Sequence, residues 1–597
     1  MLRWPDSDTA GGIEATMQSC CDNKETNDLY KDVVIIGNGP SGICLSYMLA
    51  GNWPYYTGEP HPGDEMLTAR LCSSVANSEL DLERNGINNQ QRWQNRFDGC
   101  ERKNQDRCLA RSTRCKLKCL SSGLEGRVGG RPLALLMDQL QHPGVDSGFD
   151  VPSLLTWKSR EQNPEHKLID HVVLGKGRPG GAWQSMDPNV LTISLNRWMS
   201  LPDLDIREWE TMVESEQLRK TSSADATESY THKTASRISV GTVAAYYDDY
   251  IRIKRLEQYF RCGTMVTSVR ADRVSHGCEQ DSRYGWIVEG FVIETGQPFR
   301  YRCKTVVLAT GSTDSPNRLG IPGEDSQPEW VTHHLNDLEM KLDRLVNRRI
   351  RVDAPLFHRT CERSHRRCRA TDSDSDEQPA KQIMPVLVIG AGLSAADAIM
   401  AARFRGIPVL HAFRDTSYHT EDGKWNKSED EETQRIKYKK LLGLPSSMYP
   451  EYHKVYEMME DGGKNYPLYR ALPGYTLLEI SEAGNDRHTN EPIRAATLSS
   501  PDGRVCSFRV SIVAILIGSK PDLSYLEGGG IGLGRLSDKL IDSKSNPIEV
   551  DDFTYEVIES PKAGLYALGP LVGDNFVRYI LGGAFGILAH TLTTSTT

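Results

Sequence analysis

The chain has 597 residues and a formal net charge of −9, with 25% charged and 38% hydrophobic residues. That length allows several domains of about 150 residues each, and the acidic balance gives no support for nucleic-acid binding. No run of about 18 apolar residues predicts a membrane-spanning helix. Because the fourteen cysteines match neither a secreted disulfide framework nor a zinc-finger spacing, we expect free thiols, no metal site and a cytoplasmic location.

Polar insertions interrupt the apolar, periodic parts of the chain. Residues 1–30 have the composition of a disordered tail. Residues 84–131 hold twelve Lys/Arg against four Asp/Glu. This predicts a solvated surface insertion or, alternatively, an arm that contacts a protein partner. Residues 346–382 turn from basic to acidic without an apolar core and are expected to be a disordered linker.

A glycine-rich turn, GNGPSG, follows the apolar run at residues 33–36, and a helix is predicted directly after it. In this order the first glycine makes the tight turn and the second lets the backbone approach a pyrophosphate. The third lets helix and strand pack closely, and the helix N-terminus faces the anion. The motif therefore predicts a bound dinucleotide; a glycine-rich turn without a ligand is the alternative. Its candidate cofactor residues are Gly37, Gly39, Pro40, Ser41 and Gly42.

An acidic residue about twenty positions after such a turn binds the ribose. Glu59 lies seventeen residues after Gly42 and is the candidate, although Pro54 and Gly58 make the approach a poor strand.

A second turn, GAGLSA, follows the apolar run at residues 386–389. The next predicted strand, residues 409–413, ends in Arg414 instead of an acid. A guanidinium there suits a 2′-phosphate by charge and by fork geometry, which predicts NADPH; a solvent-facing arginine is the alternative. The other candidate cofactor residues of this turn are Gly390, Gly392, Ser394 and Ala395.

Two dinucleotide turns in one chain suggest that FAD, at the first turn, meets NADPH, at the second. The apolar strand that ends near Gly311 is expected to return the chain to a nucleotide-binding sheet. Near the C-terminus, Gly573 and Asp574 precede a helix, and the carboxylate can hydrogen-bond a ribityl chain. A turn residue or helix cap is the alternative for Asp574.

The predicted fold class is α/β, with two Rossmann-like dinucleotide-binding domains and the NADPH domain inserted into the FAD domain. The expected segments are a tail at 1–30, a first part of the FAD-binding domain at 31–345, a linker at 346–382, an NADPH-binding domain at 383–504, and the rest of the FAD-binding domain at 505–597.

The cysteine pattern bears on the choice among flavin enzymes. Disulfide reductases place two close cysteines against the flavin, whereas the first helix here has only Cys44 and no C-x-x-C follows either turn. The segment GGAW, with Gly181 and Trp183, resembles the GG-x-W stretch of class B flavin monooxygenases, which runs beside the isoalloxazine ring. The segment NRWMSLPDL, beginning at Asn196, resembles the asparagine-containing stretch of flavin-containing monooxygenases.

Over roughly three quarters of its length the chain resembles the oxidative stress-induced growth inhibitor family, through blocks such as WMSLPDL, YPEYHKVYEMM and LGPLVGDNFVRY. That resemblance implies an NADPH-using monooxygenase-like flavoprotein connected with growth, cell death and cytokinesis, and a midbody location. We expect a flavin C4a-hydroperoxide, with Asn196 as a hydrogen-bond donor to it or to NADP⁺. As an alternative, Asn196 caps its own turn. Two further readings stay open: a nucleotide-binding regulator that acts through partners, and an NADPH oxidase that releases peroxide.

Overall fold

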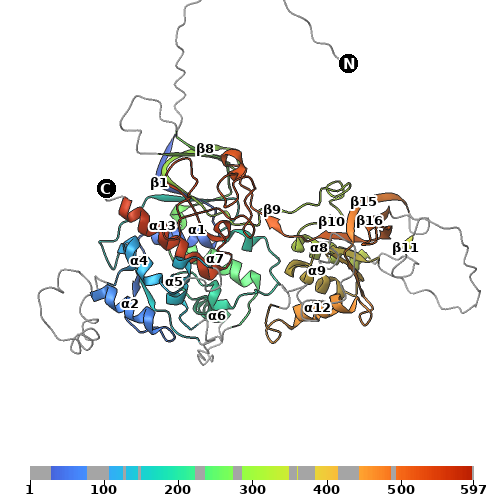
Figure 1. The fold of residues 1–597 in the computed structure, drawn as a ribbon, viewed down its shortest axis with the longest axis horizontal. Coiled ribbons are helices and arrows are strands. Elements are labelled where there is room, and N and C mark those ends of the chain that lie inside the picture. Colours follow the sequence, from blue (N-terminus) through green and yellow to red (C-terminus); the bar gives the residue numbers. More distant parts are fainter. Residues whose placement is uncertain are drawn as a thin grey trace, which may run out of the picture.

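The computed structural model describes residues 28–76, 107–124, 130–144, 150–221, 236–272, 285–348, 359–360, 384–414, 443–485 and 492–594. These residues form two lobes side by side, each with helices and a sheet that contains parallel strands (Figure 1), so the predicted α/β class is confirmed. The predicted tail up to residue 27 and most of the predicted linker 346–382 lie outside the described residues. Within the described part of the chain, no helix is both long enough and apolar enough to cross a membrane.

The first lobe is built on a seven-stranded sheet in the order β5-β4-β1-β8-β7-β6, with β20 also paired to β8. Strands β5, β4, β1, β8 and β20 run parallel, whereas β7 and β6 are antiparallel. The end of β1, residues 33–36, is buried on both faces, as its unbroken apolar run predicts. The strands are β1 (Leu29–Ile36), β4 (His171–Gly175), β5 (Phe260–Cys262), β6 (Thr264–Ala271), β7 (Trp286–Val292), β8 (Pro298–Leu308) and β20 (Leu565–Ala567).

Helix α13 lies at the centre of the first lobe, packed against α1 and α5. Its residues 580–589 are apolar and buried on all sides. A methyl group at Gly582 would overlap the backbone of Ala134, so this glycine lets α13 approach α5 closely. The helices of this lobe are α1 (Pro40–Leu49), α2 (Glu65–Ala76), α4 (Arg114–Ser121), α5 (Pro132–Gln141), α6 (Ile206–Thr221), α7 (Val240–Ile253) and α13 (Ile580–Thr594).

The described part of the basic insertion is built into the first lobe. Helix α4 and the turn before it bury Leu109, Leu117 and Leu120 in the main core. At the end of the insertion, Arg131 donates to the carbonyl of Val572, 3.1 Å away. The surface-insertion reading therefore does not hold for residues 107–124, because a leucine row hidden among the basic residues anchors them. Residues 84–106 lie outside the described residues, and a partner-binding arm there stays a prediction.

The second lobe holds a five-stranded parallel sheet in the order β10-β18-β12-β13-β14 and an antiparallel sheet in the order β11-β17-β16-β15. Its strands are β10 (Val331–Thr332), β11 (Arg359–Thr360), β12 (Val386–Ile389), β13 (Val409–Phe413), β14 (Tyr469–Pro473), β15 (Thr476–Asn485), β16 (Pro492–Ser499), β17 (Val505–Arg509) and β18 (Ile512–Ile515). Its helices are α8 (Leu335–Arg348), α9 (Leu393–Phe404) and α12 (Pro450–Asp461).

The chain passes between the lobes at two adjacent segments, β9 (Ser315–Pro316) and β19 (Ser519–Lys520), which pair with each other (Figure 1). These crossing points differ from the predicted boundaries at 345 and 505. Strand β10 and helix α8 lie before residue 349 but belong to the second lobe, and strands β17 and β18 lie after residue 504 and belong to it as well. The physical reason is strand pairing, because β18 pairs with both β12 and the two-residue strand β10. Hydrophobic periodicity in the sequence does not show pairing between segments so far apart in the chain.

Candidate functional site

The three glycines of the first turn meet different steric conditions. Gly37 has a φ of +114°, and a methyl group there would overlap the carbonyl of Ala309 at the end of β8. A methyl group at Gly42 would overlap the carbonyl of Gly37, so α1 packs against the turn only without a side chain. At Gly39, by contrast, no atom lies within 4 Å of the Cβ position. The open approach at Gly39 and the N-terminus of α1, which no side chain caps, fit a pyrophosphate.

The GGAW segment lies directly on this turn. The backbone N–H of Gly180 donates to the carbonyl of Asn38 at 2.9 Å, and the Asn38 amide donates to the carbonyl of Gly177 at 2.7 Å. Gly181 has a φ of +58°, and its Cβ position is 3.0 Å from the Gly39 Cα. The segment is therefore held where a nucleotide at the turn would meet it, and its Trp183 is half-buried.

The chain places Glu59 elsewhere than expected. Glu59 is exposed and follows β2 (Trp53–Tyr56), which pairs with β3 (Leu155–Lys158) in a separate two-stranded sheet. The strand that pairs with β1 on this side is β4, and Lys176 follows it in place of an acid. A residue that binds the ribose normally ends the strand next to β1, and β2 is not paired with β1 in this structure. Because of the long insertion after α1, the next strand in the chain, β2, is not the strand that lies beside β1 in the sheet.

The C-terminal candidates lie against the start of α1. A methyl group at Gly569 would overlap the hydroxyl of Ser41, and the backbone N–H of Asp574 donates to the carbonyl of Gly569 at 3.2 Å. Asp574 accepts from the hydroxyl of Tyr555 at 2.9 Å. Burial raises the pKa of the Asp574 carboxyl to about 6, whereas the charge of Arg131 and the hydrogen bond from Tyr555 act to lower this pKa.

Three other candidates of the first site are placed by backbone conformation. Gly573 has a φ of +94° and ends a short 3-10 turn before Asp574. Gly311 has a φ of +75° just beyond β8, and its Cβ position is open. Pro40 takes the first position of α1, where its missing N–H costs no hydrogen bond.

The second turn has the same build as the first. Gly390 has a φ of +128°, and a methyl group there would overlap the carbonyl of Leu516 at the end of β18. The Cβ position of Gly392 has no atom within 4 Å. Ala395 is buried, and its Cβ lies 3.7 Å from the position that a Cβ at Gly390 would take. Helix α9 is therefore far enough from the turn to leave room for the Ala395 methyl group. Ser394 is exposed at the start of α9.

Arg414 follows β13, which pairs in parallel with β12, and its side chain is exposed. It therefore stands at the strand end where a 2′-phosphate would be read. On the same strand, buried His411 contacts the Gly390 carbonyl at 2.6 Å through Nε2 and the Tyr469 hydroxyl at 2.8 Å through Nδ1. Burial lowers the pKa of His411 to about 4, so the neutral ring holds the turn. No local sequence pattern marks His411 for this role.

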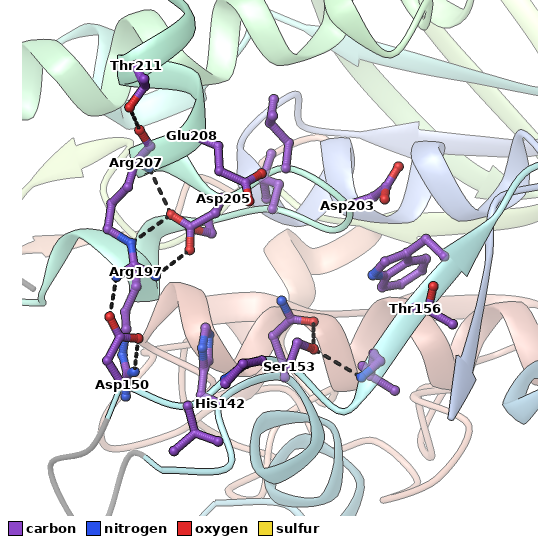
Figure 2. Close-up of a pocket in the computed structure, with 18 residues that line it drawn as sticks. His142, Asp150, Ser153, Thr156, Arg197, Asp203, Asp205, Arg207, Glu208 and Thr211 are labelled. Carbon is purple, nitrogen blue, oxygen red and sulfur yellow. Dashed lines mark hydrogen bonds and ion pairs between the residues drawn. The ribbon is translucent and has the colours of Figure 1, made fainter. Parts of the chain in front are cut away.

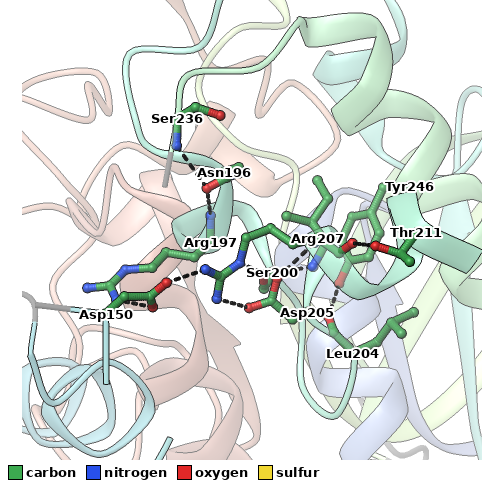
Figure 3. Close-up of polar contacts among 11 residues, drawn as sticks. Asp150, Asn196, Arg197, Ser200, Leu204, Asp205, Arg207, Thr211, Ser236 and Tyr246 are labelled. Carbon is green, nitrogen blue, oxygen red and sulfur yellow. Dashed lines mark hydrogen bonds and ion pairs between the residues drawn. The ribbon is translucent and has the colours of Figure 1, made fainter. Parts of the chain in front are cut away.

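Asn196 begins the 3-10 turn η4 (Asn196–Met199) and is only 1% exposed. Its side-chain oxygen accepts from the N–H of Arg197 at 2.8 Å and from the N–H of Ser236 at 3.3 Å (Figure 3). The oxygen therefore stabilises the turn, as the capping alternative requires, and fixes the direction of the amide. The NH₂ group is the only donor of this side chain, and its role toward a flavin or NADP⁺ stays a prediction.

Tyrosines of α7 hold the loop after Asn196. The hydroxyls of Tyr246, Tyr247 and Tyr250 donate to the carbonyls of Leu204, Met199 and Pro202, respectively. The ring of Tyr247 also meets Trp183 edge-on, with centroids 6.1 Å apart. Helix α7 thus joins the GGAW segment to the Asn196 turn. The i, i+1, i+4 spacing of the tyrosines in YYDDY is the sequence signal for this tyrosine face.

Arg237 connects the Asn196 segment to the second lobe. It donates to the carbonyl of Thr192 at 2.7 Å and to that of Met448 at 3.1 Å, and it pairs with Glu451 on α12. Its guanidinium lies 4.5 Å from the ring centroid of Tyr449.

Further contacts extend this connection on both sides. Ser236, the residue before Arg237, is the one whose N–H binds the Asn196 side chain. On the other side, Tyr452 of α12 donates to Asp397 of α9 at 3.0 Å. The helix that opens at Gly392 and the Asn196 turn are therefore joined through one chain of contacts.

No protein-family model matches the chain. Among solved structures, a bacillithiol disulfide reductase from Bacillus cereus aligns over 95% of this chain and 99% of its own, with 15% identity and a TM-score of 0.46. A flavin-containing monooxygenase from Stenotrophomonas maltophilia aligns over 95% and 100%, with 14% identity and a TM-score of 0.41. Likenesses this remote say nothing about activity.

Curated sequences give closer relatives. Oxidative stress-induced growth inhibitor 1 of Mus musculus is 37% identical over 576 residues, which cover 94% of this chain and 95% of that protein. Oxidative stress-induced growth inhibitor 2 of Homo sapiens is 34% identical over 592 residues, covering 94% and 93%. Identity at this level along nearly the whole length shows that the chain belongs to the oxidative stress-induced growth inhibitor family.

Proposed function

We propose that this protein is an NADPH- and FAD-dependent oxidoreductase of the monooxygenase type, built from two Rossmann-like domains of which the NADPH domain is inserted into the FAD domain. The observation that carries the proposal is the matched build of the two turns. In each turn the first glycine touches a neighbouring carbonyl, the second has open space around it, and the helix that follows has no side-chain cap. Each turn follows a strand that pairs in parallel on both sides. Two such sites serve a reaction that passes electrons between nucleotides.

The assignment of the two cofactors rests on the residues beside each turn. At the first turn, the Gly181–Trp183 segment and buried Asp574 offer an aromatic neighbour and a ribityl partner, which suits FAD. At the second, Arg414 suits the 2′-phosphate of NADPH. Bound flavin supplies hydride acceptance from NADPH and the activation of O₂.

The chain's own residues would bind and orient the two nucleotides and shield them from water. Gly39 and Gly392 admit the pyrophosphates, and His411 holds the second turn in shape. Asn196, which is buried and fixed in direction, offers an amide that donates a hydrogen bond. From its family we further propose that the protein acts in growth restraint under oxidative stress, with the links to cell death, cytokinesis and the midbody as extensions of that role.

The test uses the purified full chain. We expect bound flavin absorbance, NADPH oxidation that consumes O₂, and less peroxide released than NADPH consumed once a substrate is present. Peroxide equal to NADPH under all conditions would instead identify an oxidase. A protein with no flavin and no NADPH oxidation would refute the enzymatic proposal and leave a regulator that acts through partners.

Two matched variants sharpen this test, because the open glycines accept a side chain without a clash or strained backbone. Gly39→Val should fold and lose flavin, since its side chain fills the pyrophosphate space. Gly392→Val should keep flavin and lose NADPH oxidation. Retention of both activities in both variants would contradict the proposed sites.

A further inference from the structure

A cavity of about 1030 Å³ lies in the first lobe, beside the Asn196 turn (Figure 2). One wall comes from Gln141 and His142 at the end of α5 and from residues 150–157, which lead into β3. The other wall comes from η4, from the loop after it and from the start of α6. Its size matches that of pockets for small molecules. Neither glycine turn contributes to its walls, so it is distinct from the proposed nucleotide sites.

Two arginines on the wall converge on a single carboxylate. Arg197 Nη1 donates to Asp150 Oδ1 at 2.7 Å, and Arg207 pairs with the other oxygen of Asp150 (Figures 2 and 3). Asp205 holds the Arg207 guanidinium from behind, with contacts of 3.0 and 2.9 Å. The Arg197 side chain is only 6% exposed, whereas that of Asp150 is 45% exposed. The clamp is therefore rigid, while the carboxylate in it reaches solvent. We call Arg197 and Arg207 the arginine clamp.

His142 also lines the cavity and is only 7% exposed. Burial, together with the charges of Arg197, Arg207 and Arg578, lowers the pKa of His142 to about 3, so its ring is neutral. A neutral imidazole offers one donor and one acceptor. The ring can therefore donate or accept one hydrogen bond toward a ligand in the cavity.

The rest of the wall is partly apolar. Trp157, Leu201 and Leu204 face the cavity with little exposure of their own. The two arginines, a neutral imidazole and apolar side chains together suit a molecule with one acidic head and an apolar body. The acidic head fits only at the arginines, because Asp203, Asp205 and Glu208 also line the cavity.

We infer that this cavity binds a carboxylate with an apolar body, and that Asp150 is the chain's own carboxylate, which fills the arginine clamp when the ligand is absent. Exchange of one carboxylate for another keeps the buried guanidinium of Arg197 paired throughout, and this avoids the large cost of an unpaired buried charge. Asn196 directly precedes Arg197, so the ligand would sit next to the turn proposed for oxygen chemistry. Binding itself does not depend on flavin or NADPH.

The experiment compares 4-phenylbutyrate with its neutral amide, 4-phenylbutanamide, by titration calorimetry on the full chain. Asp150→Asn removes the competing carboxylate and should tighten binding of the acid at least tenfold, with no gain for the amide. Asp203→Asn is the matched control. Asp203 lines the same cavity but pairs with Lys254 and Tyr47 instead of the clamp, so this variant should show no gain.

Three outcomes would overturn the inference. They are equal affinities for acid and amide in Asp150→Asn, a gain in Asp203→Asn as large as that in Asp150→Asn, and no measurable binding of the acid to either the wild type or Asp150→Asn. A further variant, Arg197→Met in the Asp150→Asn background, should abolish the gain; its persistence would show that the clamp does not hold the ligand. If Asp150→Asn fails to fold, saturable preference of the wild type for acid over amide decides the same question.

Discussion

Single residues at the two turns differ in what they require of the backbone. Gly37 and Gly390 have positive φ and touch a neighbouring carbonyl, so both conformation and space demand glycine. Gly39 and Gly392 have ordinary extended backbones and open surroundings, so only a ligand would demand glycine there. Glycine therefore has a structural reason at the first position of the motif, whereas at the second its reason would be the proposed nucleotide.

Arg414 is expected to discriminate between the two nicotinamide nucleotides. Loss of a charge-assisted contact to a 2′-phosphate costs about 1.5–3 kcal/mol, which is roughly 10- to 150-fold in affinity. Arg414→Ala should raise the KM for NADPH by about that factor and leave the KM for NADH nearly unchanged. Steady-state kinetics with both nucleotides check this, and an equal effect on both would rule out the 2′-phosphate role.

The two roles of Asn196 can be separated by a pair of variants. Asn196→Ala removes both the acceptor oxygen and the donor, whereas Asn196→Asp keeps an acceptor for the N–H groups of Arg197 and Ser236 and removes the donor. If the NH₂ group acts in oxygen chemistry, both variants should keep NADPH-driven flavin reduction and release more peroxide. Recovery of wild-type coupling in Asn196→Asp alone would identify Asn196 as a turn cap only.

At the scale of elements, the order of strands in the sheet determines which residues lie beside the first glycine turn, and the spacing of residues in the sequence does not. Strand β2 follows α1 in the chain, and Glu59 follows β2, but β4 pairs with β1 in the sheet. Periodicity shows that a segment is a strand; it does not show which strand pairs with it, because pairing depends on residues more than a hundred positions away. The same holds for the leucines of α4, whose burial depends on contacts with the rest of the lobe.

The contact of α12 with the first lobe predicts a coupling between the lobes. Arg237→Ala removes an ion pair, two charge-assisted hydrogen bonds and a ring contact, which together are worth several kcal/mol if each contributes about 1–2 kcal/mol. We expect NADPH-driven flavin reduction to slow by at least about tenfold, while reduction by dithionite, which needs no second lobe, stays unchanged. Stopped-flow absorbance measures both.

Glu451→Gln serves as the matched control for Arg237→Ala, because it weakens the ion pair and leaves the carbonyl contacts in place. It should give a smaller loss in the same direction. If dithionite reduction slowed equally in Arg237→Ala, the variant would have damaged the flavin site itself, and the coupling would be refuted.

At the scale of the whole molecule, buried carboxyls tie stability to pH. The pKa of Asp574 is raised from 3.8 to about 6 by burial, so the folded state holds this proton more tightly than the unfolded state. Its contribution to stability is fully present below about pH 4 and is lost as the pH rises through 6, for a total on the order of 3 kcal/mol. Asp574→Asn is neutral throughout and keeps an acceptor for Tyr555.

Thermal unfolding of the flavin-free wild type and Asp574→Asn, measured from pH 4.5 to 7.5, tests this sign. The difference in Tm should move in favour of the variant as the pH rises, because only the wild type loses its proton. Comparison at each pH cancels the other titrating groups. A Tm difference that stays constant across this range would show that Asp574 does not titrate there.

The sequence by itself determined the local parts of this protein: both glycine turns, the strands and helices around them, and the strand-end place of Arg414. These follow from backbone sterics and apolar runs within about twenty residues. Only the tertiary structure decided which strand lies beside β1, where the chain crosses between lobes, how Arg237 reaches α12, and that Asp150 fills the arginine clamp. Those features join residues far apart in the chain, and they arise from packing and charge pairing that no local pattern encodes.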